Sequence, residues 1–423
     1  MIPWLCAPLA LLCDRFGGCG RKGGKKRALV LLGAGASVEY RAPTTDQLTS
    51  AIEQGVMSDP WMKTVGGDSA FEAIKTQLKA YLHRPGIVNF EHIYHCAHEL
   101  IFTFPPTPGA VDEFRPLLFP FLNNTSGIPQ DALRALVKKM AEVIFTEVSA
   151  SCGKNPLGLR PLADFIKFLR ANHVTRIYTT NYDDFVLQAV PDLYTGFAAT
   201  PSTTPKRFDS DQFWHEEDRA SLFHLHGSVH MDFAAPHVTS GAVGELFWFD
   251  DRATALKHAS FSGGTRASLR MDGSSYVPSA VVTGLDKLSL LQQRPLSDFY
   301  SALARDAMLA DLLIVIGAGL ADLHLNTWLA EARSRTPVPP LLFVDYWPNS
   351  FENDTYFEPE RKDTELFHRL QVHISEQLRG TRFGTGWILA NDCTSAIWDK
   401  GFQAFLNAPS EMRDVLAHLG SSP

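Results

Sequence analysis

Two short apolar runs, each followed by a glycine turn, constrain the fold of this chain more than any other feature. Residues 28–32 read ALVLL and continue into GAGAS, and residues 312–316 read LLIVI and continue into GAGLAD. Continuous apolar runs of this length are typical of strands that are buried on both faces of a parallel sheet. Glycine then allows the tight turn that leads from such a strand into a helix. The two runs therefore predict two buried parallel strands.

Three further segments are predicted as strands. They are VTRIYTT at 174–180, PSAVVTG at 278–284 and LLFVDY at 341–346. Strands that alternate with helices indicate an α/β fold with helices on both faces of the sheet. We predict a Rossmann-like, doubly wound parallel sheet, in which ligands bind in the crevice at the carboxyl ends of the strands.

A large helical insertion is predicted between the first strand and the strand at 174–180, over about residues 46–173. Apolar residues recur there at helical spacing in three segments, at 90–101, 133–148 and 162–169. Asn89 suits the N-cap of the first segment, and Gly153 suits the end of the second. We expect the insertion to act as a lid, as an oligomer surface, or as both.

The chain is predicted to have three parts: an N-terminal arm at 1–27, a main domain at 28–350, and a C-terminal segment at 351–423 that packs on the core. The arm holds an apolar run at 2–13, with basic residues only after it. A signal peptide has its positive charge before the run, and a spanning helix needs about 18 apolar residues. We therefore expect no membrane anchor, and an arm that docks on its own domain or on a neighbouring subunit.

Charge and cysteine usage exclude some classes of protein. The net charge of −7 and the pI of about 6.1 argue against direct nucleic-acid binding. The six cysteines include no C-x-x-C pair, so neither a zinc ribbon nor a disulfide framework is indicated. A reducing cytoplasm fits this usage best.

Two groups of histidines invite a metal interpretation. One is on the predicted helix at 90–101 and comprises His92, Cys96 and Glu99, and the other follows residue 221 and comprises His224, His226 and His230. Neither group has a second set of ligands at metal spacing nearby. We favour ordinary helix residues for the first group. For the second we favour a single acid or base, His226, at a strand end, and we expect no metal.

Polar residues follow several predicted strands, where a ligand crevice lies. Asn181 and Asp183 follow the strand at 174–180, and Asp345 ends the strand at 341–346. Asp345 suits either a ribose hydroxyl or an ordinary surface position. The GAGAS turn suits a phosphate loop, with Gly33 and Gly35 allowing close approach and Ser37 opening the helix, but a plain structural turn explains it equally well.

Taken together, GAGAS, TTNYD, LHGS and IGAGLAD resemble, in order and rough spacing, the SIR2-like family, which comprises the NAD-consuming relatives of the sirtuins. The resemblance covers about 28–45 and 170–350, and it implies NAD+ as substrate and a SIR2-like domain at 28–350. It implies that Asn181 orients the ribose and water and that His226 is the catalytic histidine. The cofactor-binding residues it implies are Gly33, Ala34, Gly35, Ser37, Thr180, Asp183, Gly317 and Gly319, to which we add Asp322 and Asp345 from their positions after strands.

The chain departs from the protein-deacylating sirtuins in several places. It has no paired zinc cysteines, so no zinc is expected. Pro43 is followed by Thr44, Thr45 and Asp46 where those enzymes have Asp-Phe-Arg, and Thr180 replaces their usual glutamine. With these departures, the chain resembles the bacterial antiphage branch of the family, in which a SIR2 domain hydrolyses NAD+.

That resemblance implies an NAD+ glycohydrolase that releases nicotinamide and ADP-ribose, forms a homo-oligomer, and partners a HerA-type hexameric ATPase. Two alternatives stay open: a protein deacylase or ADP-ribosyltransferase, and a subunit that only senses NAD or ADP-ribose and scaffolds an ATPase. For hydrolysis, we expect Asn181 to bind water and a ribose hydroxyl through its donor and acceptor atoms. His226 then takes the proton from the attacking group.

Overall fold

A computed structural model describes most of the chain. The described residues are 25–81, 88–103, 127–153, 158–198, 205–233, 245–258, 280–284, 287, 293–320, 322–347, 366, 370, 372, 382–384, 386–390 and 394–420. Most of the predicted N-terminal arm and the Gly/Ser-rich segment at 259–276 lie outside these residues.

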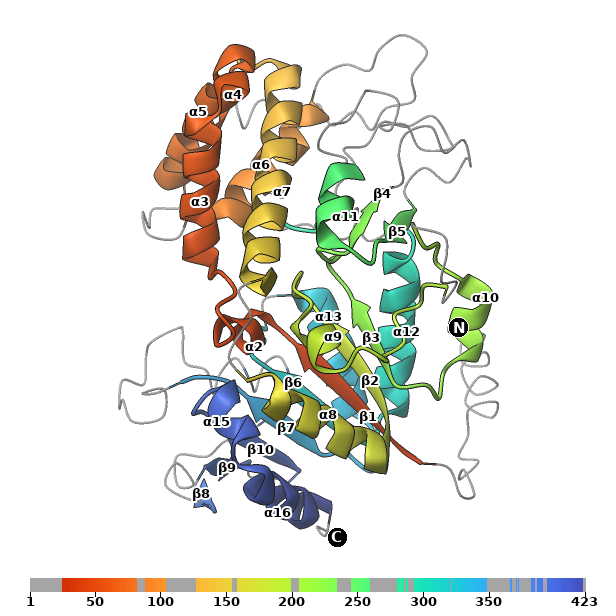
Figure 1. Ribbon diagram of the computed structural model, residues 1–423. Helices are drawn as coiled ribbons and strands as arrows, with labels where there is room; N and C mark the ends of the chain where they lie inside the picture. Colours follow the sequence, from red (N-terminus) through yellow and green to blue (C-terminus); the bar gives the residue numbers. More distant parts are fainter. Residues whose placement is uncertain are drawn as a thin grey trace, which may run out of the picture.

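Eight described strands form the main sheet, in the order β3-β2-β1-β6-β7-β10-β9-β8 (Figure 1). Their bounds are β1 Lys26–Leu32, β2 His173–Thr179, β3 Ser221–His224, β6 Leu312–Ile316, β7 Leu341–Val344, β8 Arg382–Phe383, β9 Trp387–Leu389 and β10 Ser395–Trp398. The strands from β3 to β10 in this order are parallel, and β9 is antiparallel to both of its neighbours, β10 and β8. This is the strand order of a doubly wound sheet, so the predicted fold class is confirmed.

The order of the strands reverses at β1, which lies between β2 and β6. Leu32 is level with Thr179 of β2 and with Ile316 of β6. The three strands therefore end at the same edge, and the segments that follow them lie side by side. Crevices at such a reversal point are where doubly wound folds bind ligands.

Helices cover both faces of the sheet because successive residues of β1 point to opposite sides. Ala28 and Val30 belong to a core that includes α8 Arg160–Asn172, α9 Phe185–Ala189, α15 Phe402–Leu406 and α16 Pro409–Gly420. Leu29 and Leu31 belong to the core of the opposite face, with α12 Leu296–Leu309, α13 Leu323–Arg333 and α10 Ser210–His215. The hairpin of β4 Met231–Phe233 and β5 Leu246–Trp248 lies beside α11 Arg252–His258 (Figure 1).

The segment between β1 and β2 forms a helical layer beyond the carboxyl edge of the sheet (Figure 1). After α2 Ala34–Val38 come α3 Thr45–Ser58, α4 Pro60–Val65, α5 Gly67–Tyr81, α6 Phe90–Ile101 and α7 Gln130–Gly153, and α8 then leads back into β2. All three predicted helices are present. Asn89 caps α6 by accepting from the backbone N–H of Glu91 and His92, and α7 ends at Gly153 as expected.

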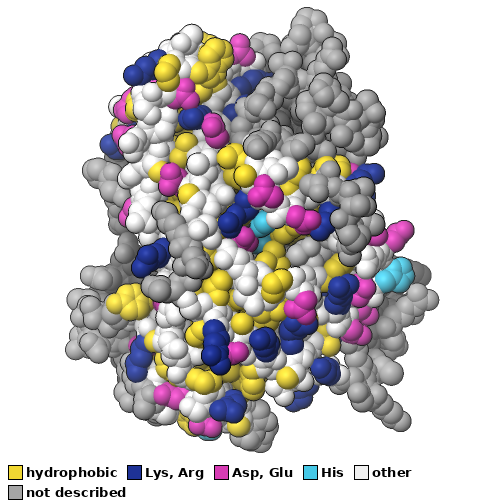
Figure 2. Space-filling view, viewed as in Figure 1, with side chains coloured by type: hydrophobic (Ala, Val, Ile, Leu, Met, Phe, Trp, Pro, Cys, Tyr) yellow, Lys and Arg dark blue, Asp and Glu magenta, His cyan; other side chains and the backbone are white. Residues whose placement is uncertain are grey.

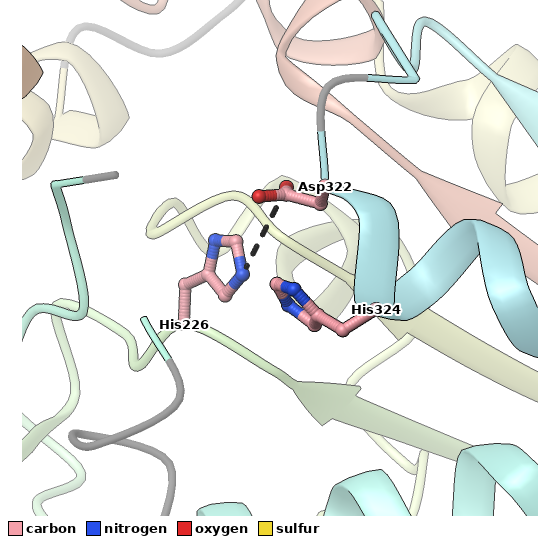
Figure 3. A group of neighbouring side chains, drawn as sticks. All are labelled: His226, Asp322 and His324. Carbon is pink, nitrogen blue, oxygen red and sulfur yellow. Dashed lines mark ion pairs between the residues drawn. The ribbon is translucent and has the colours of Figure 1, made fainter. Parts of the chain in front are cut away.

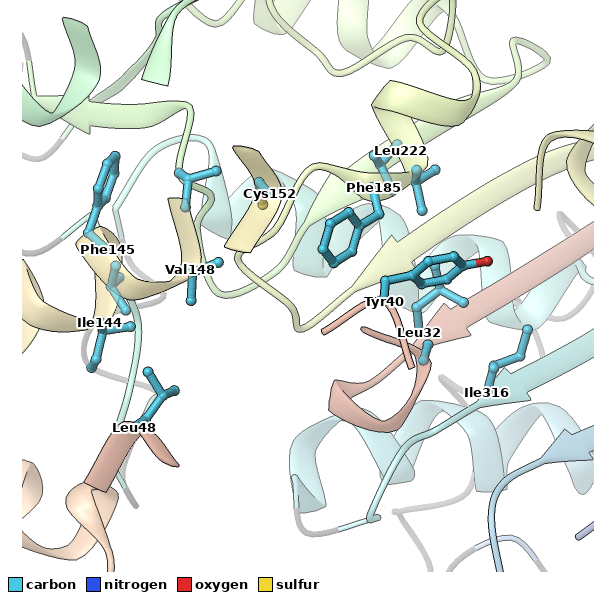
Figure 4. Packing of buried hydrophobic residues seen from close by; sticks show 14 of the residues in the cluster. Leu32, Tyr40, Leu48, Ile144, Phe145, Val148, Cys152, Phe185, Leu222 and Ile316 are labelled. Carbon is cyan, nitrogen blue, oxygen red and sulfur yellow. The ribbon is translucent and has the colours of Figure 1, made fainter. Parts of the chain in front are cut away.

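The helical layer and the sheet share one apolar core. Figure 4 shows Val148 and Cys152 of α7 between Leu48 of α3 and the ring of Phe185, next to the sheet. The layer is therefore packed directly on the sheet. No helix among the described residues combines the length and the apolar character needed to cross a bilayer.

Two strand predictions need correction. Residues 280–284 are buried but form no strand, because the Val282 N–H donates to the carbonyl of His226 across a loop and joins no ladder. His226 was expected at a strand end, but β3 ends at His224, and Gly227 follows in a left-handed turn with φ of 86°. At the other end of the chain, β10 pairs with β7, so residues after 350 extend the sheet itself.

Gly317 offers a test of the turn that follows β6. Its φ is 60°, and a Cβ there would lie 2.2 Å from the backbone nitrogen of Ala36. Left-handed backbone costs about 1–2 kcal/mol for a non-glycine residue, and overpacking adds about 1–3 kcal/mol. We expect Gly317→Ala to lower the free energy of unfolding by their sum, measured by urea denaturation.

Gly319 is the matched control, because a Cβ there would have no atom of the described residues within 4 Å. Gly319→Ala is expected to change the free energy of unfolding by no more than about 0.5 kcal/mol. Equal effects of the two substitutions would contradict this account of the turn.

Candidate functional site

A cavity of about 300 Å³ lies at the carboxyl ends of β1, β2 and β6, where the strand order reverses. Its volume is at the lower end of the range for small-molecule sites. Nine of the predicted site residues line it: Gly33, Ala34, Ser37, Thr180, Asn181, Asp183, His226, Gly319 and Asp322. Figure 2 shows acidic, basic and histidine side chains together near the middle of the face in view. The lining of the cavity combines polar residues such as Asn181 and Asp322 with the apolar residues Leu48 and Phe90.

Gly35 and Gly317 do not line this cavity, because they pack against each other beneath it. The Gly35 N–H donates to the Gly317 carbonyl at 2.9 Å, and the Gly33 N–H donates to Ile316 at 2.8 Å. A Cβ on Gly35 would lie 2.8 Å from Cα of Gly317. For these two glycines, the contact between the two turns explains the residue type without a ligand.

Asp345 also lies apart from the cavity. It follows β7 and lines a separate hollow with Gly35, Tyr346 and Lys400. Its N–H donates to the Trp398 carbonyl at 2.8 Å, and its carboxylate accepts from the N–H of Tyr346 at 2.8 Å. The structure therefore does not bring Asp345 together with Asn181 and His226.

Asn181 is held in one orientation by its side-chain amide group. Its Nδ2 donates to the Gly33 carbonyl at 2.8 Å and to the Ser37 hydroxyl at 2.7 Å. A backbone carbonyl only accepts, so the atom facing Gly33 must be the nitrogen. Both amide hydrogens are thereby used, and Oδ1 is the atom through which Asn181 can accept from a ligand. The side chain of Asn181, predicted to act as both donor and acceptor toward the ligand, can therefore act only as an acceptor.

Ser37 connects Asn181 to Asp183. Its hydroxyl accepts from Asn181 and donates to the Asp183 carboxylate, which also accepts from the N–H of Phe185. Burial raises the pKa of Asp183 to about 6, and the hydrogen bond from Ser37 only partly opposes this. Ser37 therefore orients the asparagine, in addition to lining the cavity.

His226 is buried at the side of the cavity, two residues beyond the end of β3. Burial, together with the positive charge of Lys287, lowers the pKa of His226 to about 3, although Asp322 opposes the shift. Its Nε2 lies 3.1 Å from the Tyr300 hydroxyl. The imidazole is therefore neutral near pH 7 and can accept a proton.

Tyr300 also lies 3.1 Å from Nε2 of His324. A hydroxyl has one proton, so Tyr300 donates to one imidazole and accepts from the other. The two histidines are thus coupled through Tyr300, and only one Nε2 at a time carries the proton in this arrangement.

A lysine links Asp322 to the helical layer. Lys287 Nζ lies 2.8 Å from Oδ1 of Asp322 and 3.6 Å from the carboxylate of Glu91, near the start of α6. Burial raises the pKa of Asp322, but the charge that His226 carries when it is protonated at low pH and the charge of Lys287 outweigh burial and hold this pKa below its usual value. Asp322 is therefore ionised beside the cavity.

The remaining histidines of the two predicted groups have structural partners. His224 Nδ1 lies 3.0 Å from the Asn181 carbonyl, and His230 Nε2 lies 3.0 Å from Asp184. On α6, Nδ1 of His92 completes the capping box with Asn89. These contacts support the interpretation of the α6 group as ordinary helix residues.

Among the described residues, one group of side chains could hold a metal ion. His226, Asp322 and His324 place a ligand atom each within 4.8 Å of one another. Figure 3 shows the two imidazoles and the carboxylate turned toward a common point between β3 and α13. Sequence spacing did not indicate this group, because His226 is distant in the chain from the other two.

Sequence reasoning missed Lys287, Tyr300 and His324. Tyr300 is on an amphipathic helix, where an aromatic residue is usually part of the core, and Lys287 is in a segment without periodicity. His324, the second residue of α13, follows the predicted site residue Asp322 by two positions, and this proximity was the available signal.

The family model of the SIR2-like domain matches residues 175–366. The matched region includes the strand that leads to Asn181, the loop of His226 and the turn after β6. The match supports the predicted resemblance to the SIR2-like family and an NAD-related activity. A comparison with the curated proteins finds no match.

Asp183 gives the site a pH dependence that stability measurements can detect. Its folded-state pKa of about 6 exceeds the usual value of 3.8, so it stabilises the fold below pH 4 and loses this contribution as pH rises through 6. We expect Asp183→Asn to match the wild type near pH 4. At pH 7 it should be more stable by at most about 3 kcal/mol, measured by urea denaturation.

Asp192, which pairs with Arg170 on the surface, is the control, since its pKa is lowered. Asp192→Asn should show a small effect of opposite sign that disappears as pH falls. A pH-independent difference for Asp183→Asn would contradict the assignment.

Proposed function

We propose that this chain is an NAD+ glycohydrolase, which cleaves NAD+ to nicotinamide and ADP-ribose. The observation that carries the proposal is that Asn181 and His226 face one cavity at the point where the strand order reverses. The match of residues 175–366 to the SIR2-like domain supports NAD+ as the substrate class.

The hydrolysis of NAD+ requires few groups from the protein. Breaking the nicotinamide–ribose bond passes through an oxocarbenium-like state, so the site must hold the ribose and present an oxygen nucleophile. Asn181 Oδ1 accepts a hydrogen bond from a ribose hydroxyl or from the water. His226, which is neutral, takes the proton as the nucleophile attacks, a role typically worth about 10²- to 10⁴-fold in rate.

The ionised Asp322 lies 4.0 Å from Nε2 of His226. It stabilises the imidazolium that forms when His226 accepts the proton, and so favours the transfer. Tyr300 holds the same nitrogen from another side. Burial makes the imidazolium of His226 more acidic, and the contacts with Asp322 and Tyr300 reduce this acidity when the proton is transferred.

The two alternatives have different supports and different tests. A protein deacylase or ADP-ribosyltransferase would use the same cavity, but Pro43 and Thr45 line it in the segment that departs from the deacylase pattern. An acetyl-lysine peptide assay with NAD+ separates the two reactions. A pure NAD or ADP-ribose sensor needs neither Asn181 nor His226 at the ligand. Calorimetric binding of NAD+ without product would favour the sensor.

Substitution of the two central residues tests the hydrolase. We expect Asn181→Ala and His226→Ala each to lose nicotinamide release, by at least about 100-fold for His226→Ala because the base is absent. The release is measured by chromatography after incubation with NAD+. Removing a buried hydrogen-bond partner costs about 1–3 kcal/mol, so thermal unfolding is recorded for each variant.

His215→Ala is the control, because His215 is exposed on α10 and away from the cavity. It should release nicotinamide at the wild-type rate. Wild-type turnover in a folded Asn181 or His226 variant would refute the assignment.

We also propose that the hydrolase acts in antiphage defence, as a homo-oligomer with a HerA-type hexameric ATPase. An unregulated NADase would kill its host, and the helical layer between β1 and β2 reaches the cavity through Glu91, which supports control by assembly. We expect nicotinamide release by the purified chain to rise when the ATPase is added. Equal rates with and without it would count against regulation by this partner.

A further inference from the structure

We infer that His226, Asp322 and His324 form a binding site for a divalent transition-metal ion of the Zn²⁺ class, and that the ion inhibits the enzyme reversibly. Their ligand atoms lie within 4.8 Å of one another. The inhibition rests on the proposed function of His226, whereas the binding does not.

The geometry of the three side chains favours a metal ion. Both imidazoles direct Nε2 at one hydroxyl, that of Tyr300, at 3.1 Å each, so the two nitrogens already converge. Zn²⁺ binds imidazole nitrogen and carboxylate oxygen at about 2.0–2.2 Å, so side-chain shifts on the order of 1 Å complete the site. The Tyr300 oxygen or a water molecule takes the fourth position.

Asp322 uses its two carboxylate oxygens for different partners. Oδ1 pairs with Lys287 at 2.8 Å, whereas Oδ2 faces His226 at 4.0 Å. The oxygen that faces the histidines is therefore the one that an ion would take. Figure 3 shows the carboxylate above the two rings in this view, with a dashed line that joins it to His226.

The type of ion follows from the ligands. Two imidazole nitrogens and one carboxylate suit Zn²⁺, Co²⁺ or Ni²⁺, whereas Mg²⁺ and Ca²⁺ prefer oxygen ligands. Lys287 already balances the charge of Asp322, which weakens the attraction for a second cation. The site is therefore a reversible one and differs from the four-cysteine zinc sites that the sequence excludes.

The functional consequence concerns the lone pair of His226. A metal ion bound at Nε2 occupies the electron pair that the proposed hydrolysis needs for the proton. The ion also occupies the side of the cavity formed by Asp322. Nicotinamide release should therefore fall as Zn²⁺ is added, and EDTA should restore it.

His324→Gln is the variant that tests the site. His324 does not line the cavity, and glutamine can keep a hydrogen bond to Tyr300. Calorimetric titration of the full-length protein with Zn²⁺ should show one more bound ion for the wild type than for His324→Gln. The exposed His215→Gln should match the wild type, and Zn²⁺ bound by the six cysteines contributes equally to all three proteins.

A spectrum separates this site from the cysteines without a variant. Co²⁺ held by nitrogen and oxygen lacks the thiolate charge-transfer band. The wild type should therefore show visible Co²⁺ absorption without that band, and added Zn²⁺ should remove this absorption. Asp322→Asn, a second variant, should weaken the absorption. Equal Zn²⁺ binding by wild type and His324→Gln, or Co²⁺ absorption of thiolate type alone, overturns the proposal.

Activity measurements separate this inference from the proposed function. The Zn²⁺ concentration that halves nicotinamide release, measured against each protein's own metal-free rate, should rise about 10- to 100-fold or more in His324→Gln. Loss of the extra Zn²⁺ in His324→Gln, in a protein without NADase activity, supports the site and refutes the proposed function. Zn²⁺ inhibition of equal strength in both proteins overturns the inhibitory role.

Discussion

The contact between the two glycine turns is the constraint on which the site depends. The turns after β1 and β6 are joined by backbone hydrogen bonds from Gly33 to Ile316 and from Gly35 to Gly317. A Cβ on Gly33 would lie 2.5 Å from the Gly317 carbonyl oxygen, so the turns touch without space for a side chain. Because two backbone hydrogen bonds join the turns, Asn181, which donates to the Gly33 carbonyl, is connected to both of them.

The central strands β1, β2, β6 and β7 and the helices α6, α7 and α8 could be predicted from the sequence, because periodicity and capping are local properties. The buried runs of β1 and β6 and the Asn89 cap of α6 are examples. No strand was predicted in the segment that forms β8, β9 and β10. The sequence at 280–284 could not distinguish a loop from a strand, since an apolar and fully buried segment fits either structure. What distinguishes it is the partner of Val282, a loop carbonyl of His226, and such pairing is a property of the whole fold.

The candidate site was predictable where residues follow strands, and not where they come from elsewhere. Asn181, Asp183 and His226 follow β2 and β3, and the edge of a parallel sheet brings such positions together. Tyr300 approaches His226 from the covering helix α12, and Lys287, which belongs to no described helix or strand, adds its charge to burial in lowering the pKa of His226. These contacts depend on distances that no spacing in the sequence encodes, and the same holds for the orientation that Ser37 imposes on Asn181.

The salt bridges of Lys287 have a thermodynamic consequence for the helical layer. Lys287 joins Asp322 beside His226 to Glu91 of α6, so the cavity and the layer share one cation. If a ligand in the cavity changes the position of Lys287, it also changes the free energy of the contact with α6. Linkage then requires reciprocity: a partner that binds the layer and alters the affinity for substrate by some factor has its own affinity altered by the substrate by the same factor.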